Sequence, residues 1–148
     1  MTGAPESSGV YLFVFDLRRE CVARVGALGL GRLAAGRYGY VGSARRGLAA
    51  RLARHARRRK PLRWHIDALA RCSDPAGALA WPWREGRECR LAEALTATGM
   101  GRSAIPRFGA SDCGCGGHLF ALSEGDLDRL AKALSKHLGV ASTLVLCY

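Results

Sequence analysis

Long apolar stretches are missing from this sequence of 148 residues. No run approaches the roughly 18 residues that indicate a membrane-spanning helix. The opening "MTGAPESSG" has neither the basic start nor the apolar stretch of a signal peptide. We therefore expect a cytoplasmic protein without membrane partners, and the short polar segment 1–8 is expected to be a disordered tail. In the cytoplasm the six cysteines should be mostly reduced.

Acidic residues and lysine are also scarce. The chain has 12 Asp and Glu against 23 Lys and Arg, a net charge of +11, and 20 of the 23 cations are arginine. Because the planar guanidinium group of arginine matches the geometry of phosphate, the first partner to expect is a polyanion. DNA is the leading candidate, with RNA as the alternative.

The 49% hydrophobic content and the chain length predict a single domain over residues 9–148. Its core should span about 9–100 and a strand-helix-strand extension about 101–148. Strands are predicted at 9–16, 21–26, 37–42, 78–83, 118–122 and 142–148. Helices are predicted at 47–59, 62–69, 85–98 and 124–138, the last with Ser123 as its N-cap. The glycine-containing segments 27–36 and 99–117 are predicted as loops, and "SDPAG" at 73–77 as a helix breaker.

These elements predict an α+β fold, in which helices flank a small central sheet that is antiparallel or mixed. The segment "GVYLFVFD" is apolar at nearly every position, so its strand should be the central one. Pro82 should place the strand "ALAWPW" at a sheet edge or at a strand end.

The segment from Arg45 to Arg63 contains nine cations and no acid. A helix beginning near Gly47 would place Leu48 and Leu52 on its buried face and His55 on its basic face. Most charge runs are only solvated surfaces. Here, however, eight cations are expected to contact backbone phosphates: Arg45, Arg46, Arg54, Arg57, Arg58, Arg59, Lys60 and Arg63.

Two similar triplets, "GVY" at 9–11 and "YVG" at 40–42, precede this basic helix. They resemble the triplets of the GIY-YIG nuclease superfamily, with valine in place of both isoleucines. The strings "WHIDAL", "ECRL" and "FGASDCGC" before "HLF" are similar to the Uri-type endonuclease branch. The resemblance covers residues 9 to about 120, and it implies a metal-dependent endonuclease that hydrolyses phosphodiester bonds of DNA, including structured or damaged DNA in repair.

The resemblance also implies a set of catalytic residues: Tyr11, Tyr40, Arg51, His55 and Glu88. Arg51 would bind phosphate oxygens and Glu88 would hold Mg²⁺ or Mn²⁺, with Glu93 as the competing ligand. Tyr11 would accept the proton of the attacking water. Since free tyrosine has a pKa near 10, this requires either nearby cations that favour phenolate or a relay that passes the proton onward.

Each of these residues also has a structural interpretation. Tyr11 and Tyr40 could be strand aromatics, and Tyr38 is expected to be structural. Near the C-terminus, Cys113, Cys115 and His118, with Cys89 as a fourth ligand, fit a structural Zn²⁺ site, and buried free thiols are the alternative.

Two departures from the family pattern bear on activity. Ser43 stands where a lysine is common, and a separate DNA-binding domain is not evident, so target choice would depend on the basic face or on a DNA-targeting protein partner. A second function is therefore open, that of a non-catalytic nucleic-acid-binding module that retains the nuclease fold.

Overall fold

The computed structural model describes residues 8–24, 30–56, 72–104 and 118–147. Within these residues, six strands form one sheet in the order β6-β7-β4-β1-β5-β8, and every adjacent pair is antiparallel. The strands of this sheet are β1 (Gly9–Leu17), β4 (Gly36–Ala44), β5 (Ser73–Trp81), β6 (Gly101–Ser103), β7 (Leu119–Leu122) and β8 (Thr143–Cys147). A separate two-stranded sheet pairs β2 (Cys21–Arg24) with β3 (Leu30–Leu33).

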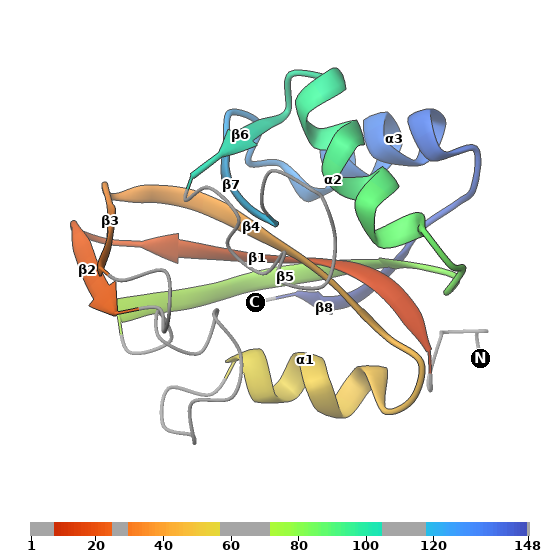
Figure 1. Ribbon diagram of the computed structural model, residues 1–148, viewed down its shortest axis with the longest axis horizontal. Helices are drawn as coiled ribbons and strands as arrows, with labels where there is room; N and C mark the ends of the chain where they lie inside the picture. The colour runs from red at the N-terminus through yellow and green to blue at the C-terminus, as the bar shows by residue number, and fades with distance from the viewer. Residues whose placement is uncertain (1–7, 25–29, 57–71, 105–117, 148) are drawn as a thin grey trace.

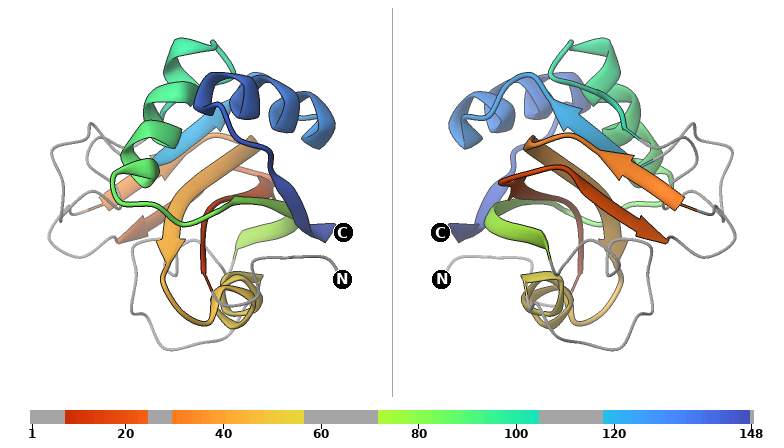
Figure 2. Two further views of the ribbon diagram at one scale, coloured as in Figure 1. Left: turned by 90° about the vertical axis from the view of Figure 1, so that its right-hand side faces the viewer. Right: turned by 90° about the vertical axis from the view of Figure 1, so that its left-hand side faces the viewer.

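Helices cover both faces of the sheet (Figure 1). Helix α1 (Leu48–Ala56) lies on one face, while α2 (Arg87–Ala97) and α3 (Leu127–Leu138) lie together on the other, as Figure 2 also shows. None of the helices in the described ranges is long and apolar enough to cross a membrane. The expected α+β fold is confirmed.

Strand β1 is central and buried on both faces, as its apolar sequence predicts. Side chains alternate along a strand, so Tyr11, Phe13 and Phe15 pack in the core beneath α1. Val10, Leu12 and Val14 pack in a second core beneath α2 and α3. The sheet therefore separates two hydrophobic cores.

Several local predictions are wrong. Residues 30–33 of the expected loop form β3, and residues 101–103 of the second expected loop form β6. The expected helix breaker "SDPAG" is instead the first half of β5, where Pro75 lies opposite Phe15 at an irregularity in the β1–β5 register. A proline is tolerated there because the hydrogen-bond ladder is already interrupted.

The predicted helix boundaries also change. Helix α3 begins after Asp126, whose side chain accepts a hydrogen bond from the Arg129 amide at 3.0 Å, so Asp126 replaces Ser123 as the N-cap. Helix α1 is confirmed from Leu48 to Ala56. The predicted helix at 62–69, the end of the basic segment and the expected tail through residue 7 lie outside the described residues.

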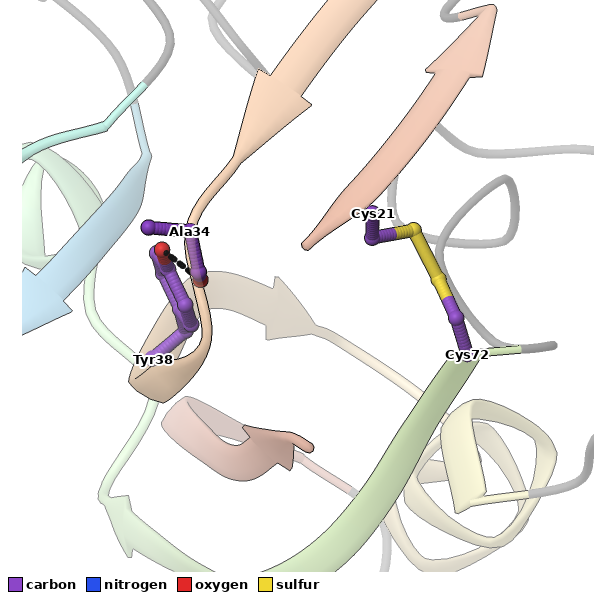
Figure 3. The surroundings of a disulfide bond; sticks show 4 residues. All are labelled: Cys21, Ala34, Tyr38 and Cys72. Atoms are coloured by element: carbon purple, nitrogen blue, oxygen red, sulfur yellow. Dashed lines mark hydrogen bonds between the residues drawn. A yellow bond between two sulfur atoms is a disulfide. The ribbon is translucent and has the colours of Figure 1, made fainter. Parts of the chain in front are cut away.

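Cys21 and Cys72 form a disulfide, with their Cα atoms 6.4 Å apart. It joins the start of β2 to the residue before β5 (Figure 3). The expectation of reduced cysteines is therefore wrong for this pair, because a separation of 51 residues in the sequence conceals their proximity in the fold. Close by, the Tyr38 hydroxyl donates to the Ala34 carbonyl at 2.6 Å, which agrees with a structural role for Tyr38.

We expect the double substitution Cys21→Ser and Cys72→Ser to lower the free energy of unfolding by about 2–4 kcal/mol, because the disulfide closes a long loop. Thermal melting with and without reductant measures the effect. Cys89→Ser is the matched control, since Cys89 is a cysteine that takes no part in this disulfide. Equal melting of the oxidised wild type and the double variant would contradict a stabilising disulfide.

Candidate active site

The two sequence triplets lie side by side on neighbouring strands. In the β1–β4 pairing, Tyr11 is opposite Gly42, Leu12 is opposite Val41 and Phe13 is opposite Tyr40. The Tyr11 ring lies over Gly42 so closely that a Cβ atom at Gly42 would come within 2.5 Å of the Tyr11 Cζ. Glycine is thus required at the end of the second triplet by the ring of the first.

Tyr11 and His55 form a buried hydrogen bond beneath α1, with the hydroxyl oxygen 2.7 Å from Nε2. Their side chains are only 2% and 3% exposed. The Tyr40 ring also packs against His55 in a perpendicular, edge-to-face arrangement, with ring centroids 5.7 Å apart. The prediction that His55 belongs to the basic face is wrong, because His55 follows Leu48 and Leu52 on the buried face of α1.

The Tyr11 hydroxyl is held in its neutral form. Burial raises the pKa of Tyr11 well above its ordinary value of 10.0, the neighbouring Tyr40 and Glu88 raise it further, and the charge of Arg51 and its hydrogen bond to Tyr11 oppose this only in part. At neutral pH Tyr11 is therefore a phenol that can donate to an unprotonated Nε2 of His55. Of the two routes open to a tyrosine base, the arrangement favours a relay over a stable phenolate.

Ser43 connects the two faces of the sheet. Its hydroxyl donates to Glu88 Oε1 at 2.5 Å on the α2 side, and its backbone carbonyl accepts a hydrogen bond from the Arg51 guanidinium of α1. Sequence comparison with the nuclease family marked Ser43 only as a missing lysine. In the fold, Ser43 contacts both Arg51, the candidate phosphate-binding residue, and Glu88, the candidate metal ligand.

Glu88 lies in the first turn of α2 and is held from two sides. Besides the Ser43 contact, its Oε2 lies 2.8 Å from Nδ1 of His118, which is 1% exposed. The His118 backbone carbonyl accepts the amide of Val41 at 2.8 Å, so this histidine is attached to the second triplet. Glu93, the competing ligand candidate, is exposed on the same helix.

The carboxyl of Glu88 is ionised at neutral pH. Burial by itself would raise its pKa, but hydrogen bonds from His118 and Ser43, together with the charges of His118 and Arg51, lower the pKa below the ordinary 4.5. Carboxylate oxygens have about four lone-pair sites in all, so the two hydrogen bonds leave capacity for a cation. The donor set is therefore compatible with Mg²⁺, which needs only one or two protein carboxylates when waters and substrate phosphates complete its shell.

The predicted phosphate-binding cations are only partly described. Arg45 and Arg46 are exposed where β4 leads into α1, and Arg54 is half-buried. The Arg45 guanidinium lies 4.4 Å above the ring of Trp83, which orients it by a cation–π contact. Arg57, Arg58, Arg59, Lys60 and Arg63 lie outside the described residues.

Only two of the four predicted zinc ligands lie in the described residues. Cys89 is a half-buried thiol and His118 faces Glu88, whereas Cys113 and Cys115 lie outside the described residues. In the part of the chain that the structure describes, three or more potential ligands do not lie together as a metal-binding group. The sequence indicated His118 only as a zinc ligand. Its contact with Glu88 makes it part of the candidate active site.

Residues 10–140 match a protein family described as a domain of unknown function, DUF123. The chain belongs to DUF123. The matched range includes every member of the cluster around Tyr11 and Glu88, and the family description states no activity. Neither a curated protein nor a solved structure matches the sequence significantly.

We expect Gly42→Ala in this DUF123 protein to destabilise the fold by about 1–3 kcal/mol, because the added methyl group would overlap the buried Tyr11 ring. Gly125→Ala is the matched control, since its Cβ would come no closer than 3.2 Å to its nearest neighbour, the Arg37 Cδ. Urea unfolding of both variants checks the difference. Equal losses of stability would show that the Tyr11 ring can move away from Gly42.

The lowered pKa of Glu88 predicts a pH-dependent contribution to stability. The folded state binds this proton less tightly than the unfolded chain, so the contribution is complete above about pH 4.5 and is lost as the pH falls through the lower folded-state pKa. We expect Glu88→Gln to reduce the free energy of unfolding at neutral pH and to approach the wild type in acid. Urea titrations at several pH values, with Glu93→Gln as the exposed control, measure this. A difference independent of pH would contradict the ionised, hydrogen-bonded state of Glu88.

Proposed function

We propose that this DUF123 protein is a metal-dependent endonuclease of the GIY-YIG type that hydrolyses phosphodiester bonds of DNA. One observation carries the proposal, a continuous chain of contacts from His55 through Tyr11, Arg51 and Ser43 to Glu88. These residues come from two strands and two helices, and they include a proton acceptor, a cation for phosphate and an ionised carboxylate.

Phosphodiester hydrolysis needs these three groups in one place. The substrate is an anion, so negative charge that builds up in the transition state must be stabilised by fixed positive groups. Arg51 is suited to this because the Ser43 carbonyl and the Tyr11 hydroxyl orient its guanidinium from the protein side. A guanidinium group can donate two parallel hydrogen bonds to the non-bridging oxygens of one phosphate.

Glu88 would hold the divalent cation, Mg²⁺ or Mn²⁺, in this proposal. Ser43 and His118 fix the orientation of the carboxylate and favour its charged form. The bound cation would supply further charge for the phosphate and for the leaving oxygen. His118 therefore acts as a positioning residue, in the way that partners of a metal ligand set the ligand's orientation.

The Tyr11–His55 pair supplies a route for the proton of the attacking water. Because Tyr11 is a neutral phenol, its oxygen can accept a proton only as its own proton passes to His55 Nε2, which lies 2.7 Å away. The Tyr40 ring packs against the imidazole ring in a perpendicular arrangement. The pair would thus work as one relay.

DNA is the proposed substrate because the chain carries a net charge of +11 and exposes Arg45 and Arg46 beside the cluster. RNA presents the same phosphodiester and is the competing substrate. A non-catalytic nucleic-acid-binding module is the alternative function. Both functions predict binding that weakens with salt, so only cleavage distinguishes them.

We expect the wild type to cleave DNA with Mg²⁺ or Mn²⁺ and Glu88→Ala to lose this metal-dependent cleavage. Arg51→Ala should reduce the rate by about 10²–10³, the effect of removing one preorganised charge donor. Gel assays with supercoiled, linear, branched and single-stranded DNA, and with RNA, measure both rate and substrate class.

Tyr11→Phe tests the relay, because it removes the hydroxyl and keeps the buried ring. We expect a loss of about 10²-fold or more. Tyr38→Phe is the matched control, since it removes a hydroxyl that hydrogen-bonds a backbone carbonyl in the same core. Cleavage by Tyr11→Phe at the wild-type rate over a full pH profile would exclude the relay. Binding without cleavage by the wild type would favour the non-catalytic module.

A further inference from the structure

A concave site lies around the start of α2. It has a volume of about 260 Å³ and is lined by Arg84, Glu85, Arg87, Arg90 and Leu138. The three arginines recur at every third position, and Leu138 is the last residue of α3. We call this site the arginine pocket. None of its residues belongs to the cluster around Tyr11 and Glu88, or to the basic segment between Arg45 and Arg63.

The arginine pocket concentrates positive charge. Three guanidinium groups and one carboxylate line it, a net charge of +2. Burial lowers the pKa of Arg87, and the like charges of Arg84 and Arg90 lower it further, so Arg87 is repelled by both neighbouring cations. Arginine stays charged despite such a shift.

Local contacts hold this charge in place. The Arg87 guanidinium donates to the Pro82 carbonyl at 2.7 Å, which orients the half-buried side chain without neutralising it. Gly86, the N-cap of α2, provides no side-chain hydrogen bond to the first turn of the helix. The positive end of the helix dipole therefore adds to the guanidinium charges at the same end of α2.

We propose that the arginine pocket binds a phosphate group of the nucleic-acid backbone. A tetrahedral anion can receive hydrogen bonds from several guanidinium groups at once, and it would relieve their mutual repulsion. Arg87 and Glu88 are consecutive in the first turn of α2, so the pocket and the candidate active site lie at the same end of one helix. The choice of nucleic acid as the source of the phosphate rests on the proposed function, whereas the affinity for phosphate does not.

The test compares two pairs of substitutions that remove equal charge. Arg84→Gln with Arg90→Gln removes the two exposed arginines of the pocket and leaves the Arg87 contact intact. Arg18→Gln with Arg129→Gln is the matched control, because both arginines are exposed and neither lines the arginine pocket. Fluorescence anisotropy of a labelled DNA duplex, at several salt concentrations and without divalent cations, gives the affinity and its salt dependence.

We expect the pocket variant to bind DNA about tenfold more weakly than the control variant, the effect of losing charge-assisted contacts. The magnitude of the slope of log affinity against log salt should fall by about 1, since each lost phosphate contact changes it by about 0.9. Glu85→Gln removes the one carboxylate of the pocket and should increase the affinity, whereas Glu93→Gln on the outer face of α2 should have a smaller effect.

Equal DNA affinity and salt slope for the pocket and control variants would overturn the proposal. Titration with inorganic phosphate distinguishes the two sources of the anion. If the wild type binds phosphate, the pocket variant does not, and both bind DNA as the control does, the pocket serves a free phosphate compound and the nucleic-acid assignment is wrong. Absence of cleavage by the wild type would count against the proposed nuclease and leave this comparison of binding intact.

Discussion

The antiparallel register of β1 and β4 is the constraint on which the candidate active site depends. It places Tyr11 against Gly42 and Phe13 against Tyr40, and this aligns the two triplets over the α1 face. The same register turns the side chain of the next residue, Ser43, toward α2. A shift of one residue would exchange the two faces of β4. It would also separate Arg51 from Glu88, because Ser43 contacts both.

The cluster holds two acidic groups in opposite states. Tyr11 is almost fully buried, and its desolvation outweighs the favourable charge of Arg51, so the phenol stays protonated. Glu88 is less buried and receives two hydrogen bonds, which outweigh its desolvation, so the carboxyl stays ionised. Neighbouring groups with divergent pKa values are typical of acid–base sites. This division agrees with the proposed roles of a proton relay and a cation ligand.

The first turn of helix α2 presents a carboxylate on one side and arginines on the other. Glu88 faces Ser43 and His118, whereas Arg87 and Arg90 face the arginine pocket near the end of α3. The excess of arginine in the sequence is therefore not confined to the segment after the second triplet. If both proposals hold, one helix would contribute the metal ligand and a separate phosphate contact, so the nucleic acid would be positioned relative to the carboxylate by the helix itself.

Apolar periodicity is a local property of the chain, and it was enough to predict the α+β class, the central strand and helices α1, α2 and α3. A resemblance carried by short motifs singled out Tyr11, Arg51, His55 and Glu88 as candidate site residues, and the fold brings these four residues together. Strands β3, β6 and the first half of β5 were missed, since these short or glycine- and proline-containing segments are extended only because a partner strand pairs with them. The tertiary structure alone decided the disulfide between Cys21 and Cys72, the burial of His55, and the contacts of Ser43 and His118 with Glu88. Each of these depends on which distant segments become neighbours in the fold, and no local pattern encodes that distance.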